Sequence, residues 1–234
     1  MRLPKIMLGT SPFISAGQFG ERSRIYFERF YNNPQRIVEI IDKCHQIGID
    51  AIQLLPEKYI IDAVELWESK TGKKLNIVSS IYDARQIEML LGKFNHSAVL
   101  LHGAIADRHR KSEVVGFIER IRDRGVLSGI VSHTPYRTLS WALKEGIELD
   151  VVMIPINKTG YMMDSDIQNI REIVENIGSR VIAKKVLAAG RIRPREAVEY
   201  ISKLDFVDSI AIGVASVEEA EETFKIAIQT FNKK

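Results

Sequence analysis

The sequence predicts a single parallel (β/α)8 barrel over residues 1–234, and three observations support this fold class. Eight short runs rich in Ile and Val alternate with longer amphipathic segments along the chain. Each run is almost continuously apolar, which is typical of a strand buried on both faces of a parallel sheet. The length suits one barrel domain, and no linker or low-complexity tract divides it. The predicted strands are residues 5–11, 50–56, 75–81, 97–103, 127–133, 150–157, 180–187 and 208–216.

The segments between the strands carry helix signals. The first begins at Pro34, repeats apolar residues every three or four positions and stops at Gly48. The last begins at Ser216 with Glu219 three residues later, the spacing of a capping box. An open doubly wound sheet is the alternative arrangement, but "GTSPFISAGQFG" after the first strand lacks the G-x-G-x-x-G spacing of its nucleotide-binding turn. The glycines predicted to end helices before strands are Gly48, Gly125, Gly146 and Gly178.

The connection between the first strand and the first helix, residues 14–33, is much longer than the two to six residues usual in such units. In a barrel this loop lies over the active face. It can act there as a lid, form part of an oligomer interface, or fold as a short extra helix packed on the barrel rim. Its aromatic and basic residues are Phe19, Arg22, Arg24, Tyr26, Phe27, Arg29, Phe30 and Tyr31.

The composition excludes several classes of protein. A net charge of +3 without a basic run argues against nucleic-acid binding. No apolar stretch approaches the roughly 18 residues needed to cross a bilayer, and no signal segment precedes "KIMLGTSPF", so we expect a cytoplasmic protein without a membrane partner. The single cysteine, Cys44, lies in an apolar helical pattern and is interpreted as a core residue. Abundant Ile, Lys and Glu point to a thermophilic source; the oligomeric state is open.

In barrels of this kind the C-terminal ends of the strands carry the chemistry. Nearly every predicted strand here ends in a polar residue, which is more than packing requires. We therefore expect a pocket on this face. The polar residues at the strand ends are Ser11, Gln53, Ser79 or Ser80, His102, Ser132, His133, Asn157, Lys158, Lys184, Lys185 and Ser216.

Two of these ends carry candidate catalytic groups. His102 suits proton transfer or polarisation of a carbonyl, although a hydrogen-bonded structural histidine is the alternative. Lys184 and Lys185 are adjacent in the seventh strand, so alternation predicts that one enters the barrel mouth and the other faces the helices. A lysine in an apolar mouth can form a Schiff base or hold an anion; one that only extends to the rim is the alternative.

The seventh and eighth strands are followed by small residues, in "LAAGRI" and "IGVAS". This corner of the fold is a common phosphate site, and the helix that begins at Ser216 adds its N-terminus. Arg191 and Arg193 can supply positive charge there. A metal site would need His102, His133 and a carboxylate such as Asp107 or Glu57, but no diagnostic ligand spacing supports one, so no metal is predicted.

Five segments resemble the aldo/keto reductase superfamily, in the right order and at the right strands. They are "LGTSPF", "LLHGAIADR", "IVSHTPYRTLSWALKEGIELDVVMIPIN", "VIAKKVLAAGRI" and "VDSIAIGVASVEEAEET". In that family a tyrosine protonates a carbonyl oxygen while a nicotinamide cofactor delivers hydride. The resemblance implies that His102 is the catalytic histidine and Tyr59 the catalytic tyrosine. Gln53 occupies the position of the catalytic aspartate, and the third strand offers serines in place of the catalytic lysine.

The resemblance also implies a path for NAD(P). Ser132 and Asn157 would line the nicotinamide, whereas Lys184 falls where the family often stacks an aromatic ring on it. The acidic start of the last helix disfavours a 2′-phosphate, so NAD would suit better than NADP. The residues expected along the pyrophosphate and adenine are Gly190, Arg191, Gly213, Ser216 and Glu222.

Three functions are compatible with these features. The first is an aldo/keto-reductase-like enzyme that acts on a small carbonyl compound through His102 and Tyr59. The second is a cofactor-free lyase, aldolase or isomerase of a small phosphorylated substrate, with Lys184 as nucleophile or anion anchor and His102 as acid and base. The third is a non-catalytic binding barrel. The incomplete set of catalytic residues favours the second and third, and the extent of the resemblance favours the first.

Overall fold

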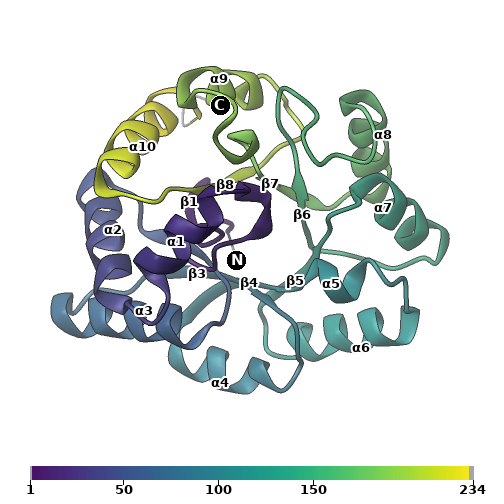
Figure 1. Cartoon of the computed structure of the whole chain (residues 1–234). Helices are drawn as coiled ribbons and strands as arrows, with labels where there is room; N and C mark the ends of the chain where they lie inside the picture. Colours follow the sequence, from purple (N-terminus) through teal and green to yellow (C-terminus); the bar gives the residue numbers. More distant parts are fainter. Residues whose placement is uncertain (1, 232–234) are drawn as a thin grey trace.

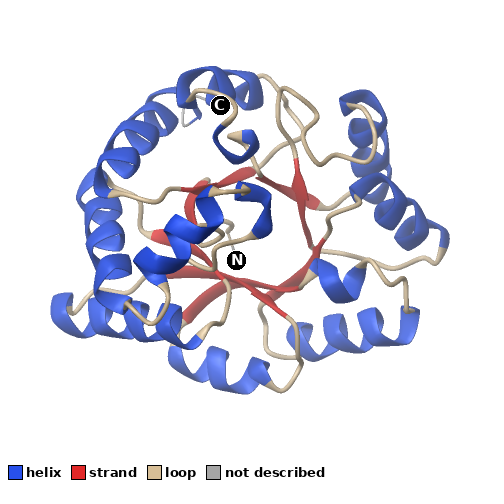
Figure 2. Cartoon of the chain, viewed as in Figure 1, coloured by secondary structure: helices blue, strands red, loops and turns tan. Residues whose placement is uncertain are grey.

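The eight parallel strands close into a barrel in which neighbours in sequence are neighbours in space (Figure 1). This computed structural model describes residues 2–231. Helices surround the sheet on its outer side (Figure 2), as the buried, nearly all-apolar strands require. The predicted fold class is confirmed. The strands are β1 (Ile6–Gly9), β2 (Ala51–Leu54), β3 (Asn76–Ile81), β4 (Asn95–Leu101), β5 (Leu127–Val131), β6 (Val151–Pro155), β7 (Arg180–Lys184) and β8 (Ser209–Gly213).

The helix ends follow the predicted signals. Gly48 and Gly178 end their helices in the left-handed conformation, where glycine carries no steric penalty. At the last helix the Ser216 hydroxyl accepts a hydrogen bond from the Glu219 amide, and the Glu219 carboxylate accepts one from the Ala215 amide. The helices are α1 (Arg22–Phe30), α2 (Pro34–Ile47), α3 (Lys58–Thr71), α4 (Gln86–Lys93), α5 (Gly103–Ala106), α6 (Lys111–Arg122), α7 (Pro135–Lys144), α8 (Ile167–Ile177), α9 (Pro194–Ser202) and α10 (Val217–Phe231), with 3-10 turns η1 (Gly17–Phe19) and η2 (Ala188–Gly190).

The apolar core has two parts. A large cluster fills the space between the sheet and the helices, and Cys44 belongs to it, as expected. A smaller cluster fills the barrel interior with residues two positions apart along the strands. Because side chains alternate, the next inward position on each strand faces the mouth of the barrel. The residues of the interior cluster are Leu3, Met7, Ala51, Val78, Ala98, Leu100, Val131, Val151, Met153, Ile182 and Ala211.

Residues 14–33 form η1 and α1, which lie over the mouth of the barrel (Figure 1). The helix is anchored by aromatic packing, with the Phe30 ring centroid 4.8 Å from that of Phe13. Arg29 donates a hydrogen bond of 2.6 Å to the carbonyl of Ala215, beyond β8. The segment therefore contains an extra helix packed on the barrel rim, one of the alternatives drawn from the sequence. Among residues 2–231, no helix is both long and apolar enough to cross a bilayer.

Close contact between β5 and β6 generates a stability prediction. A Cβ at Gly129 would lie 1.8 Å from the carbonyl oxygen of Val151, so Gly129→Ala must push the two strands apart. We expect it to lower the free energy of unfolding by about 3 kcal/mol or more, measured by chemical denaturation. Gly116→Ala is the matched control, because nothing lies within 4 Å and alanine favours the helix by about 1 kcal/mol. Equal stability of the two variants would contradict this packing.

Candidate active site

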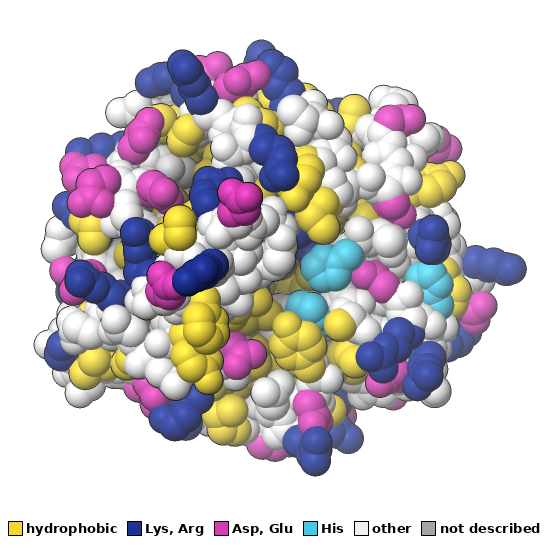
Figure 3. Space-filling view, viewed as in Figure 1, with side chains coloured by type: hydrophobic (Ala, Val, Ile, Leu, Met, Phe, Trp, Pro, Cys, Tyr) yellow, Lys and Arg dark blue, Asp and Glu magenta, His cyan; other side chains and the backbone are white. Residues whose placement is uncertain are grey.

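The mouth of the barrel and the α1 segment enclose a cavity of about 550 Å³. Its size is within the range of small-molecule sites. Figure 3 shows histidine side chains beside a hollow in the middle of this face. The cavity is lined by the strand-end positions that alternation turns inward, above the apolar interior. Its polar and charged lining residues include Ser11, Gln18, Arg22, Gln53, Ser80, Tyr82, His102, His133, Lys184, Lys185, Arg191, Arg193, Glu219, Glu222 and Thr223.

Lys184, the last residue of β7, brings an amine into this cavity two positions beyond the interior residue Ile182. Its Nζ lies 3.0 Å from Nδ1 of His133, close enough for a hydrogen bond. Burial lowers the pKa of Lys184 well below its ordinary value, and the adjacent Lys185 lowers it further, while Asp107 opposes the shift. The structure therefore favours the neutral amine, which is the nucleophilic form of lysine.

The two histidines beside this amine are held in their neutral form. Burial is the main cause that lowers the pKa of His102 to about 4. Burial is also the main cause that lowers the pKa of His133 to about 3. Nδ1 of His102 accepts a hydrogen bond of 3.1 Å from the Ala104 amide, so its proton lies on Nε2. A neutral imidazole with an Nε2–H group can polarise a carbonyl oxygen without a net charge.

Asp107 fixes the loop that positions His133. Its carboxylate accepts hydrogen bonds from the hydroxyls of Ser132 (2.6 Å) and Thr138 (2.8 Å) and from the His133 amide (2.9 Å). Gly103 lets the ring approach, because a Cβ there would lie 2.7 Å from Cδ2 of His133. Within residues 2–231 no cluster of three or more His, Cys, Asp or Glu side chains can hold a metal ion. The Asp107 carboxylate, a candidate metal ligand in the sequence, instead accepts the hydrogen bonds that position the loop.

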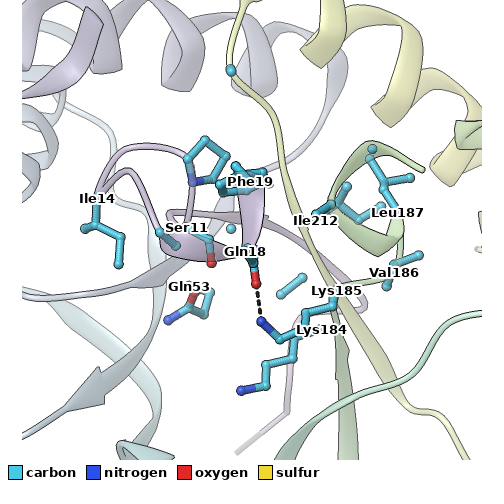
Figure 4. A pocket seen from close by; sticks show the side chains of 18 of the residues that line it. Ser11, Ile14, Gln18, Phe19, Gln53, Lys184, Lys185, Val186, Leu187 and Ile212 are labelled. Carbon is cyan, nitrogen blue, oxygen red and sulfur yellow. Dashed lines mark hydrogen bonds between the residues drawn. The ribbon is translucent and has the colours of Figure 1, made fainter. Parts of the chain in front are cut away.

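Lys185 also enters the cavity, which corrects the expectation that one of the two lysines faces the helices. Alternation fails because β7 ends at Lys184 and Lys185 has a left-handed backbone with φ +57°. Its Nζ donates to Oε1 of Gln18 in η1 (Figure 4). Burial lowers the pKa of Lys185 to about 8. Two cationic or potentially cationic amines therefore share one wall of the cavity.

The corner predicted to bind phosphate is partly occupied by the protein itself. Arg22 of α1 donates to the carbonyl of Ala189, and its guanidinium lies 2.8 Å from where a Cβ of Gly190 would be. The Arg191 guanidinium stacks over the Tyr161 ring at 4.1 Å. Positive charge is present at this corner, but α1 covers it. The contact between Arg22 and Ala189 joins residues 167 positions apart, so the sequence alone did not predict it.

Tyr59, predicted as the catalytic tyrosine, does not line the cavity. It lies on α3 under the α1 segment, where its hydroxyl donates to the Phe13 carbonyl at 3.0 Å. Burial raises the pKa of Tyr59 to about 12, so it is a weaker acid than a free tyrosine. The tyrosine that does line the cavity is Tyr82, whose ring centroid is 4.0 Å from that of His102. Tyr82 directly follows β3, and this position at a strand end could have identified it as a residue of the site.

Three residues expected to contact a cofactor also lie outside the cavity lining. Asn157 uses its amide to bind the backbone of Tyr161, at 2.8 Å and 2.9 Å. Ser132 binds Asp107, and Ser216 caps α10. These side chains satisfy structural hydrogen bonds. The predicted site residues that the structure brings together around the cavity are Gln53, His102, Lys184, Gly190, Arg191, Gly213 and Glu222.

Comparison with known proteins finds similar solved structures but no similar family model or curated sequence. No protein-family model matches the chain, and no curated protein matches it. A candidate aldo-keto reductase from Pseudomonas aeruginosa superposes with a TM-score of 0.70 at 18% identity, over 98% of this chain and 92% of that one. The chain has the aldo-keto reductase fold. This agrees with the resemblance seen in the sequence.

Two further solved structures are similar over nearly the whole chain. Gox0644 in its apo form gives a TM-score of 0.67 at 12% identity, over 99% of this chain and 89% of that one. A variant of Gox0644 is solved in complex with NADPH, with a TM-score of 0.66. An aldo-keto reductase from a Medee basin deep-sea metagenome library gives 0.65 at 11% identity, over 99% of this chain and 92% of that one.

The residues present do not fit a nicotinamide ring. Lys184 stands where the resemblance places a stacking aromatic ring, and an amine cannot replace that surface. The Ser132 hydroxyl and the Asn157 amide are engaged within the protein, so they are not presented to a carboxamide. Arg22 crosses the corner expected for the pyrophosphate. The fold is shared, and the groups that would hold the nicotinamide are used otherwise.

The buried Lys184 amine generates a prediction on stability. Its pKa is lower in the folded chain than in the unfolded chain, so the unfolded state binds the proton more readily. The contribution of Lys184 to the free energy of unfolding therefore falls as the pH drops below about 10.4, the ordinary pKa of lysine. We expect Lys184→Met to stabilise the protein at pH 7 and to lose that advantage towards pH 10, measured by urea unfolding.

Lys185→Met is the matched control. Its pKa is lowered less, to about 8, so the gain at pH 7 should be smaller. A Lys184→Met effect that stays constant from pH 7 to pH 10 would contradict a depressed amine pKa.

Proposed function

We propose that the chain is a cofactor-free enzyme that forms a Schiff base between Lys184 and a small carbonyl compound, as a lyase, aldolase or isomerase. The observation that carries this proposal is the desolvated Lys184 amine, 3.0 Å from Nδ1 of His133 inside the barrel mouth. Burial lowers the pKa of this amine, the cavity is the size of a small molecule, and a polarising donor lies beside it. A reductase mechanism is less well supported, because Tyr59 does not line the cavity and the expected nicotinamide contacts are engaged within the protein.

The residues can divide the steps of Schiff-base formation. Nζ of Lys184 attacks the carbonyl carbon while Nε2–H of His102 hydrogen-bonds the carbonyl oxygen. A proton moves from the attacking nitrogen to the oxygen, giving a carbinolamine, while Nδ1 of His133 orients the amine through its hydrogen bond. The second amine proton leaves with that oxygen as water, and a C=N bond remains. Once protonated, this imine accepts the electron pair of a neighbouring C–H or C–C bond, and hydrolysis by one water restores the amine.

The cationic wall supports an anionic substrate, such as a phosphorylated one. Lys185 contributes an ammonium whose partner in the free protein is the neutral Gln18 side chain. Arg22 and Arg191 line the same side of the cavity. A phosphate or carboxylate can replace Gln18 as the partner of Lys185 at little cost, because a charge-assisted hydrogen bond is stronger than a neutral one. The α1 segment then covers the substrate and excludes water.

Reductive trapping tests the proposal. Borohydride reduces an imine to a stable secondary amine, so incubation with D-glyceraldehyde 3-phosphate or pyruvate should label Lys184. We expect Lys184→Met to lower the trapping rate at least about 100-fold, because burial lowers the pKa of this amine more than that of Lys185, the other lysine in the cavity lining. Peptide mass spectrometry locates the label, and Lys185→Met serves as the control that must keep it. Labelling spread over surface lysines and unchanged in Lys184→Met would overturn the proposal.

A nicotinamide-dependent reductase of a small carbonyl compound is the second candidate. It is favoured by the NADPH complex of a structure with the same fold, and by a cavity that extends to Gly190, Gly213 and Glu222. Calorimetric titration with NADH and NADPH separates the two. Since the nicotinamide contacts are absent, we expect no binding of either up to about millimolar concentration. Micromolar binding would instead support the reductase, with NAD the better fit to the acidic start of α10.

A further inference from the structure

The wall of the cavity opposite the lysines is polar and uncharged. It is formed by Gln53 at the end of β2, Ser80 near the end of β3 and Ser11 just after β1. In the closed order of strands, β3 lies across the barrel from β7, which carries Lys184. Figure 4 shows Gln53 and Ser11 on one side of the pocket and the two lysines on the other. A molecule bound between them touches both walls.

One polar group of this wall is buried without a hydrogen-bond partner, and a second faces the cavity. Ser80 is 2% exposed, and its hydroxyl has no hydrogen-bond partner among the described residues. Gln53 is 6% exposed and lines the cavity, and its amide is not among the buried groups that lack a partner, so it is open to the cavity. Burial of a polar group without a partner is unfavourable. A ligand that supplies the missing hydrogen bonds recovers this cost.

The neighbouring serine on β3 shows that only the inward-facing hydroxyl lacks a hydrogen-bond partner. Ser79 points the other way and lies 2.8 Å, Oγ to Nε2, from the buried His96. On β3, then, the outward hydroxyl is satisfied by the protein and the inward one is not. Ser209 is a second buried serine without a partner, but it does not line the cavity.

We propose that Gln53 and Ser80 form a subsite for a hydroxyl group, so that the substrate is a hydroxyaldehyde or hydroxyketone. This inference rests on the proposed function, which places the substrate carbonyl at Lys184. A side-chain amide and a hydroxyl each donate and accept, as a substrate hydroxyl does. A carboxylate or ammonium on this wall would be buried without a counter-charge. The substrate therefore carries its anionic group towards Lys185 and its hydroxyl towards β2 and β3.

Binding of two analogues without a carbonyl tests the subsite separately from Schiff-base chemistry. The probes are glycerol 3-phosphate and propyl phosphate, which share the anion and differ by two hydroxyls. We expect wild type to bind glycerol 3-phosphate at least about tenfold more tightly by calorimetry, because the deoxy probe offers no hydroxyl to Gln53 and Ser80. Ser80→Ala and Gln53→Leu should each remove most of this preference.

Ser209→Ala is the matched control, because it removes an equally buried, unpartnered hydroxyl outside the cavity. It should keep the tenfold preference. Equal affinity of wild type for both probes, no binding of either up to about 10 mM, or the same loss of preference in Ser209→Ala would overturn the subsite. Trapping with D-glyceraldehyde 3-phosphate on the same preparations reports on Lys184 alone. A labelled Lys184 with equal probe affinities therefore removes the subsite and leaves the proposed function standing.

Discussion

The amine of Lys184 is held in the barrel mouth among apolar side chains, against the neutral ring of His133 and next to the amine of Lys185. A protonated amine in this place loses water and gains a like charge, so the neutral form is favoured. The rest of the site follows from this constraint. The two imidazoles stay neutral because they are buried beside the lysines, and Asp107 offsets part of the positive charge while it fixes the loop of His133.

The barrel supplies this environment through alternation and through one strained connection. Below the site, the apolar interior residues exclude water, and the next inward positions are Gln53, Ser80, His102 and Lys184. After β7 the chain takes left-handed backbone angles at Lys185, Ala188 and Ala189, none of which is glycine. Such angles cost about 1 kcal/mol or more each and tend to occur at functional sites. Here they turn Lys185 into the cavity and present the Ala189 carbonyl to Arg22.

Much of this arrangement was predictable from the sequence, because strand position and alternation are local properties. The apolar runs located the strands, and the residue after each run located Gln53, His102 and Lys184. The errors concern side chains whose direction depends on distant groups. Tyr59 follows the second strand as the family pattern requires, yet its hydroxyl donates a hydrogen bond to the Phe13 carbonyl instead of lining the cavity. Asn157 binds a turn, Lys185 follows a backbone reversal, and Arg22 reaches a loop far along the chain. No pattern in the sequence encodes these contacts.

The pKa of Lys184 measured by NMR on protein with 13C-labelled lysine tests the central claim most directly. Lys184→Met assigns the Cε resonance of this side chain, and a titration from pH 6 to 11 gives its midpoint. We predict a midpoint well below the ordinary 10.5, with burial as the main cause, and an upward shift in Lys185→Met because a neighbouring positive charge is removed. A midpoint at or above 10.5 would mean that the amine is protonated at neutral pH, and it would contradict the account.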